Sequence, residues 1–151
     1  MQSLTNLIDR RNISGRMSEL LPGDAARWGS MSVHQMVCHL NDSYRMALGE
    51  KYASPASGFL QRTLLKRLAL DLPLQWAKGF PTRPEVEQGN GGSLPLDFRQ
   101  DLASLLSTVD RFCDALPAPC VPHPIFGAMT AKDWLRWGYL HADHHLRQFG
   151  R

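Results

Sequence analysis

Four stretches of the chain repeat apolar residues every three or four positions, which is the spacing of one buried helix face. They cover residues 3–21, 33–48, 96–116 and 134–148. Turn-forming residues stand between them, and no stretch shows the regular alternation that is typical of a half-buried strand. We therefore expect an all-α protein that folds as one domain over residues 1–151.

Residues 51–95 depart from this regular pattern. Residues 56–72 contain a further helical repeat that Pro73 closes, and residues 79–95 form a long loop rich in proline and glycine. We expect an inserted helix followed by either a lid over a site or a flexible excursion. The glycine cluster at residues 88–93 lacks the Lys-Ser/Thr ending of a phosphate-binding loop, which excludes a nucleotide site there. The apolar repeat of the inserted helix consists of Phe59, Leu60, Leu64, Leu65, Leu68 and Leu72.

Capping residues predict where the helices begin and end. Ser30 or Ser32 is expected to cap the second helix at its start, and Gly49 to end it. Thr130 and Asp133 form a capping-box pattern for the last helix. Residues 121–127 are expected to be a stiff extended link because each proline restricts the residue before it. The expected inward residues of the first helix are Leu4, Leu7, Ile8, Ile13, Met17, Leu20 and Leu21.

Composition narrows the class of protein. Hydrophobic residues make up 43% and charged residues 21%, proportions that indicate a globular protein. A formal net charge of +3 is too small and too scattered to indicate nucleic-acid binding. No apolar run reaches about 18 residues and no apolar leader is present, so we expect neither a membrane span nor a secretory signal. Three cysteines without a C-x-x-C spacing favour the reducing cytoplasm.

The candidate chemistry lies in the last helical stretch. His141 and His145 are four positions apart, so on a helix their rings lie one turn apart, on the apolar face. Two imidazoles in an apolar interior need polar partners. These partners are either a shared metal ion or hydrogen-bonding groups across the core. The opposite face is expected to carry Arg136, Asp143, His144 and Arg147.

A third histidine ligand would come from the second helix. His34 and His39 lie just beyond opposite edges of its apolar face, and periodicity does not choose between them. His39 is favoured because Met36, Ser43 and Met46 surround it as a narrow mixed stripe. His34 lies near the helix start, where we expect exposure to solvent.

Several spaced motifs accompany these histidines. They are Trp28-Gly-Ser-Met-Ser32, Met36-Val-Cys-His39-Leu, Ala47-Leu-Gly49, His123-Pro-Ile-Phe-Gly127 and His141-Ala-Asp-His-His145-Leu-Arg-Gln148. In this combination they resemble the DinB/YfiT-like superfamily of metal-dependent helical bundles. More narrowly, the chain resembles the branch of it that ends in His-His-Leu-Arg-Gln-Phe. The resemblance spans nearly the whole chain.

This resemblance implies a four-helix bundle with an extra helix and a long loop inserted between the second and third helices. It also implies that His39, His141 and His145 hold a divalent metal ion. Many members carry Arg-Gly-Gln after the second histidine of the pair, whereas this chain keeps only the glutamine of that motif, Gln148. Activities in the superfamily include transfer of low-molecular-weight thiols to electrophiles and isomerisation of a thiol adduct, and members often form homodimers.

Three neutral imidazoles suit Zn²⁺ or Ni²⁺, and also Fe²⁺, better than Mg²⁺ or Ca²⁺, which prefer oxygen ligands. Three protein ligands leave one position open for water or a substrate thiol. We therefore expect a metal-dependent thiol S-transferase or hydrolase that acts on a small molecule. The alternatives are a bundle that binds a metal or small ligand without catalysis or only dimerises, and a metal-free protein with hydrogen-bonded core histidines.

Other polar and aromatic residues near these histidines are candidates for supporting roles. Gln148 is expected either to orient a ligand or to make an ordinary interior hydrogen bond. His123 is expected to be a fourth ligand, a proton carrier or part of a structural loop. Trp134, with its neighbour Trp137, is expected either to wall a substrate pocket or to pack between helices. Asp42, like Asp143, is expected to lie on the surface, and no general base is evident.

Overall fold

A computed structural model describes residues 1–56, 58, 60–73, 75–79, 82–115 and 121–151. The helices are α1 (Leu7–Ser18), α2 (Val33–Ala47), α3 (Lys66–Asp71), α4 (Phe98–Ala115) and α5 (Ala131–Gln148). A π-helical turn, η1 (Gln61–Leu65), leads into α3, and a 3-10 turn, η2 (Pro84–Val86), precedes α4. The described residues contain no β-strand, which confirms the all-α prediction.

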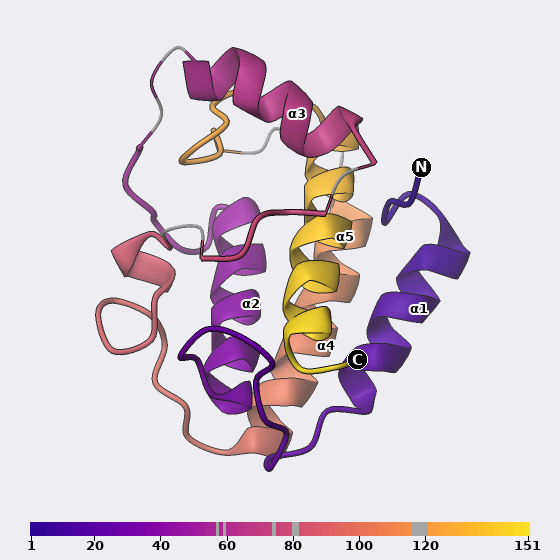
Figure 1. Cartoon of the computed structure of the whole chain (residues 1–151), viewed down its shortest axis with the longest axis vertical. Coiled ribbons are helices and arrows are strands. Elements are labelled where there is room, and N and C mark those ends of the chain that lie inside the picture. Colours follow the sequence, from indigo (N-terminus) through magenta and orange to yellow (C-terminus); the bar gives the residue numbers. More distant parts are fainter. Residues whose placement is uncertain (57, 59, 74, 80–81, 116–120) are drawn as a thin grey trace.

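The four long helices lie beside one another, and α3 crosses one end of the group (Figure 1). Helix α2 packs against α4 and α5, while α1 packs against the same two helices from another side. Helix α3 contacts α5. Among the described residues, no helix is both long and apolar enough to cross a membrane.

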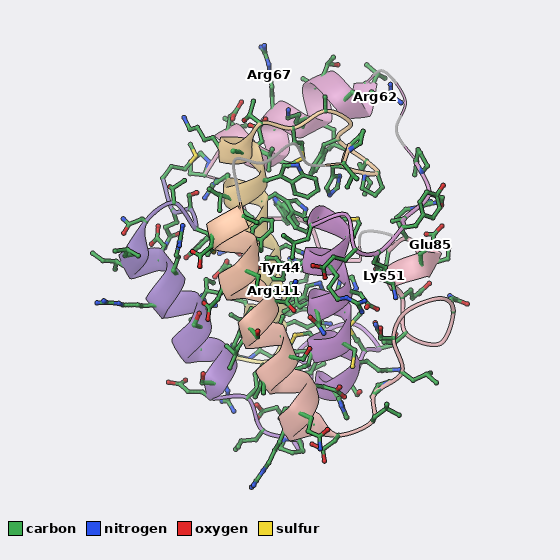
Figure 2. All side chains as sticks on the ribbon, turned by 180° about the vertical axis from the view of Figure 1, so that it is seen from behind. Tyr44, Lys51, Arg62, Arg67, Glu85 and Arg111 are labelled. Atoms are coloured by element: carbon green, nitrogen blue, oxygen red, sulfur yellow. The ribbon has the colours of Figure 1, made fainter. Side chains whose placement is uncertain are left out.

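Gly138, in the middle of α5, lies where several elements pack closely against this helix. Tyr44 is fully buried, and its hydroxyl donates a hydrogen bond of 2.7 Å to the Gly138 carbonyl. Figure 2 shows Tyr44 within the group of helices. A Cβ atom at Gly138 would lie only 2.8 Å from Phe112 Cε1 and 3.0 Å from Leu4 Cδ1. It would also lie 3.2 Å from Tyr44 Cε1 of α2, so the absence of a side chain at Gly138 lets α2, α4 and the N-terminal segment all pack closely against α5.

The predicted capping residues set the ends of α2 and α5. Ser32 accepts a hydrogen bond from the Gln35 amide, and the Gln35 side chain accepts one from the Ser32 amide. Thr130 and Asp133 form the same reciprocal pair at α5. Gly49 has a φ of +78°, which a helix-terminating glycine adopts without strain. These boundaries depend on local chemistry, which explains why sequence alone predicted them.

The predicted length and inward face of α1 are partly wrong. The helix begins after Asn6, whose side-chain oxygen accepts a hydrogen bond from the Ile8 amide, rather than at residue 3. Leu7 and Ile8 are 64% and 73% exposed because the buried face of the short helix points elsewhere, and Leu21, which lies beyond the helix end, is 60% exposed. The predicted inward residues that are buried are Leu4, Ile13, Met17 and Leu20.

The inserted helix is shorter than predicted and turns a different face inward. The described helical residues begin at Leu60, directly before η1, rather than at residue 56, and Phe59 lies outside the described residues. Leu70 is the residue of α3 that is buried. Its carbonyl accepts a hydrogen bond of 3.1 Å from Arg136. Arg136 is therefore buried, contrary to its predicted outer position, because carbonyls of α3 and Gln2 satisfy its guanidinium. The members of the predicted apolar repeat that are exposed are Leu60, Leu64, Leu68 and Leu72.

The segment predicted to be a stiff extended link forms a tight turn instead. The backbones of His123 and Gly127 exchange two hydrogen bonds of 2.8 Å, and Gly127 has a φ of +68°. His123 Nδ1 accepts hydrogen bonds of 3.1 Å from the amides of Ile125 and Phe126. This side-chain acceptor stabilises the turn, a contribution that the proline pattern does not reveal. The predicted end of the preceding helix at residue 116 lies outside the described residues.

Two helical glycines test the close packing against α5 at Gly138. Gly138→Ala is expected to lower the free energy of unfolding by about 1–3 kcal/mol because the new methyl group overpacks the core. Gly15→Ala in α1, where an added Cβ meets nothing within 4 Å, is expected to raise it by about 0.5–1 kcal/mol. Urea unfolding of both variants measures the difference. Equal effects from the two substitutions would contradict the described packing at Gly138.

Candidate metal centre

Three histidine rings converge where α2 faces α5. His39 comes from α2, and His141 and His145 come from consecutive turns of α5. His39 Nε2 lies 3.1 Å from His141 Nε2, and ligand atoms of all three rings lie within 4.8 Å of one another. The ring centroids are 4.8–5.1 Å apart. The packing of α2 on α5 therefore brings together the three side chains that the sequence analysis singled out.

Hydrogen bonds to protein oxygens orient two of the rings. His39 Nδ1 lies 2.7 Å from the Val86 carbonyl, and a carbonyl only accepts, so Nδ1 carries the proton. His145 Nδ1 lies 2.9 Å from Gln148 Oε1, and the Gln148 amide group donates to the Trp28 carbonyl at 2.8 Å. In the neutral state, both rings therefore present an unprotonated Nε2.

His141 completes the cluster without a comparable anchor. Its Nδ1 is buried and has no hydrogen-bond partner among the described residues. Two nitrogens bound to one tetrahedral zinc ion would lie about 3.3–3.4 Å apart, given Zn–N distances near 2.05 Å. The observed 3.1 Å between the Nε2 atoms of His39 and His141 is close to that separation. The three donors thus have the chemistry to hold a divalent ion, and their ligand atoms lie within 4.8 Å of one another.

Burial keeps the three rings neutral. It lowers the pKa of His39, although the hydrogen bond to Val86 opposes the shift. It also lowers the pKa of His141 and His145 well below the ordinary value, with further lowering from neighbouring histidines. Neutral imidazoles are the form that binds metal ions, so at neutral pH the cluster does not first have to lose protons.

The cluster forms part of the wall of a cavity of about 500 Å³. This volume is within the range of small-molecule binding sites. Trp28, Trp76 and Trp137 also line the cavity, as do His123 and His144. A ligand in the cavity would therefore meet the three histidine rings and several aromatic side chains together.

The tryptophans that border the cavity are only partly those expected. Trp134 is fully buried and is not among the lining residues, so its packing against Trp137 and His123 accounts for it. Trp28 and Trp76, which do line the cavity, were missed. They lie in segments without helical periodicity, and such segments contain no signal for the direction of a side chain.

His144 lies against the cavity, although its predicted face was the outer one. Its ring centroid is 5.9 Å from that of Trp28 and 6.3 Å from that of Trp76. Residues 75–79 pass over this side of α5, where Gln75 accepts a hydrogen bond of 2.9 Å from Arg147. The side of α5 that was predicted to face solvent is therefore covered by a segment that is distant in sequence.

Residues 82–95 pack against α2 and supply the carbonyl that orients His39. Asp42, predicted to be a surface residue, is fully buried beneath this segment. It accepts hydrogen bonds from the Ser93 amide at 2.6 Å and the Ser93 hydroxyl at 2.7 Å, and it pairs with Lys51 at 3.1 Å. Asp42 thereby anchors the segment that contains Val86. Residues 80–81 of the predicted loop lie outside the described residues.

A second group of potential ligand atoms joins α2 to the start of α4. His34, predicted to be exposed, is half-buried, and its Nε2 lies 2.7 Å from Asp101 Oδ2. Cys38 Sγ lies 3.9 Å from the same oxygen, which also accepts from the Leu96 amide. Burial and the Asp101 charge raise the pKa of the Cys38 thiol to about 12, so the thiol is protonated. The His34–Asp101 pair accounts for this group as a link between helices.

Asp143 and His123 have structural partners. Asp143 pairs with Arg16 at 2.9 Å and Arg147 at 2.8 Å, and it remains partly exposed. His123 borders the cavity, but its Nδ1 is occupied by the two amides of its own turn. Its ring stacks on Phe126, with centroids 4.7 Å apart. The described contacts therefore favour the structural role for His123.

The His123 ring makes stability depend on pH. Burial lowers its pKa to about 3, so the unfolded chain binds a proton that the folded protein excludes. The free energy of unfolding should therefore fall as pH decreases from about 6.5 towards 3, by up to about 1.4 kcal/mol per pH unit for this one group. His123→Asn keeps a hydrogen-bond acceptor for the turn and removes the imidazole that takes up a proton in the unfolded chain. Its unfolding free energy, measured from pH 7 to 4, should decline less steeply than that of the wild type, and an equal slope would contradict the assignment.

Comparison with known proteins places the chain in a family. A family model described as "Protein of unknown function (DUF1569)" matches residues 6–151. No curated protein and no solved structure matches the chain. The expected membership of the DinB/YfiT-like superfamily is wrong, since the matching model is that of another family and nothing places the chain in that superfamily. With nearly its whole length matched, the chain belongs to the family of unknown function DUF1569.

Proposed function

We propose that this protein is a metal-dependent enzyme that acts on a small organic molecule. His39, His141 and His145 would hold a divalent ion within a four-helix bundle formed by α1, α2, α4 and α5. The observation that carries the proposal is the convergence of three histidine rings at the wall of a cavity of about 500 Å³. A site for a purely structural metal needs no such cavity beside it.

The donor set favours Zn²⁺ or Ni²⁺ and also suits Fe²⁺, because all three donors are imidazole nitrogens. Mg²⁺ and Ca²⁺ prefer carboxylate and carbonyl oxygens. Within the described residues, no carboxylate belongs to the cluster of the three histidines. A three-ligand site leaves a coordination position for water or substrate.

An ion held in this way would lower the pKa of a bound water or thiol and so provide a nucleophile near neutral pH. This chemistry suits hydrolysis or the transfer of a thiol to an electrophile. The chain's own residues would orient the site. Val86 and Gln148 hold the rings of His39 and His145, and the indole of Trp137 packs against the ring of His141.

One observation supports a metal-free alternative. The 3.1 Å between His39 Nε2 and His141 Nε2 also suits an N–H···N hydrogen bond, with His141 as donor. In that arrangement the histidines are core residues, and the cavity binds a ligand without catalysis or has no ligand. The two readings differ in metal content, which elemental analysis of untagged protein measures directly.

Removal of one ring tests the metal site. His141→Ala is expected to reduce bound zinc from about one ion per chain to near zero, because two imidazoles hold zinc far more weakly than three. Turnover of esters or of thiol–electrophile pairs should be lost with the metal. His34→Ala, which removes a histidine outside the cluster, should retain the metal. A wild-type protein that contains no metal would contradict the proposal, and a protein that binds metal without turnover would favour a non-catalytic site.

Gln148 tests how far the orientation of His145 matters. Gln148→Leu removes the acceptor for the His145 Nδ1 proton, and we expect zinc affinity to fall by about 10–100-fold. Gln148→Glu keeps an acceptor for the His145 Nδ1 proton, so its zinc affinity should fall less. Gln100→Leu, at an exposed position of α4, is the control and should bind zinc as the wild type does. Competition with a chromogenic chelator measures each affinity, and unchanged binding by Gln148→Leu would show that this hydrogen bond is dispensable.

A further inference from the structure

The wall of the cavity beside the three histidines is aromatic and carries little charge. Its tryptophans come from three different segments, which are the turn before α2, the stretch after α3 and α5 itself. Among the described lining residues, Arg83 and Glu87 are the only ones with a full charge at neutral pH when the histidines are neutral. These features restrict the kind of molecule that the cavity would accept.

Two indole rings flank the candidate ligand His141. The Trp137 ring centroid lies 4.9 Å from that of His141 with an interplanar angle of 38°. The Trp76 centroid lies 6.0 Å away at 32°. Trp76 Nε1 donates a hydrogen bond of 3.1 Å to the Ala69 carbonyl, which holds this ring against α3. The space beside the cluster is therefore bounded by flat apolar surfaces that are already held in place.

The remaining walls are also largely apolar. Leu65 and Leu68 border the cavity from the side of η1 and α3, and Ile125 and Phe126 border it from the turn at residues 123–127. A flat ring that enters this space exchanges water for contacts with aromatic and aliphatic side chains. Transfer of such apolar surface out of water stabilises binding in proportion to the area buried.

The described lining residues offer one positive and one negative side chain. Arg83 donates a hydrogen bond to Ser54, although its buried Nε has no partner among the described residues, and Glu87 accepts one of 2.6 Å from Asn90. A ligand with several charges would lose water without gaining enough opposite charges in return. The cavity is therefore poorly suited to multiply charged molecules, including peptide-like thiols.

We propose that the cavity takes a substrate with a flat, apolar, preferably aromatic body and a single metal-binding group directed at the three histidines. This inference rests on the proposed function, because that group would bind the metal ion. It narrows the substrate class to molecules in which the apolar body supplies much of the affinity. A thiol qualifies only if its body is apolar.

Two hydroxamates provide a matched pair of probes. Benzohydroxamate and acetohydroxamate share the same metal-chelating group and differ in a phenyl ring against a methyl group. With the zinc-loaded full chain, benzohydroxamate is expected to bind at least about tenfold more tightly, because its ring becomes buried. Glutathione at equal concentration should not displace it. Calorimetric titration measures the affinities, and zinc content is determined separately on the same samples.

Substitution of one residue of the cavity wall tests whether the preference for benzohydroxamate arises in this cavity. Trp76→Ala is expected to remove most of the preference for benzohydroxamate while leaving zinc content and acetohydroxamate binding near wild-type values. Tyr52→Ala is the control because Tyr52 is 73% exposed and is not among the cavity-lining residues. This variant should keep the full preference.

The outcomes separate this inference from the proposed function. Two outcomes would overturn the substrate class without contradicting the metal site. In the first, zinc-loaded protein binds both hydroxamates with equal affinity, and in the second, glutathione displaces benzohydroxamate. A preference that Trp76→Ala does not change would also overturn it. Protein that takes up no zinc and binds neither hydroxamate would overturn the proposed function itself.

Discussion

The close contact between α2 and α5 at Gly138 is the constraint on which the candidate centre depends. Tyr44 reaches the Gly138 carbonyl only because no side chain stands between the two helices. The same contact brings His39 of α2 to within 3.1 Å of His141, one turn further along α5. A wider separation would leave His141 and His145 without their third partner. Core packing and the candidate chemistry are thus consequences of the same interface.

The orientation of the rings depends on segments outside these two helices. Gln148 connects His145 to the backbone of Trp28, and the carbonyl of Val86 fixes the tautomer of His39. Val86 is held in turn by a segment anchored on the buried carboxylate of Asp42. Loops that look irregular in sequence therefore control which nitrogen of each ring faces the centre. This explains why a charged residue is fully buried close to a cluster of neutral histidines.

The cavity combines this polar cluster with apolar walls. Neutral imidazoles at one wall can bind a metal ion, while the indoles of Trp76 and Trp137 bound the space beside His141. The proposed chemistry follows from the histidine cluster, and the proposed substrate class follows from the apolar walls. They can be tested separately, since metal content does not require the apolar walls and ring preference is measured by ligand binding. Membership of DUF1569 supplies no activity with which to choose between reactions.

Sequence alone determined what depends on neighbours along the chain. Helical periodicity, the caps at Ser32 and Thr130, and the shared face of His141 and His145 all follow from local spacing. Tertiary structure decided the rest, because the deciding contacts join residues far apart in the chain. It placed His39 rather than His34 beside the pair and covered the outer side of α5 with residues 75–79. Periodicity predicts that a residue lies on a face of a helix, but only packing determines what covers that face.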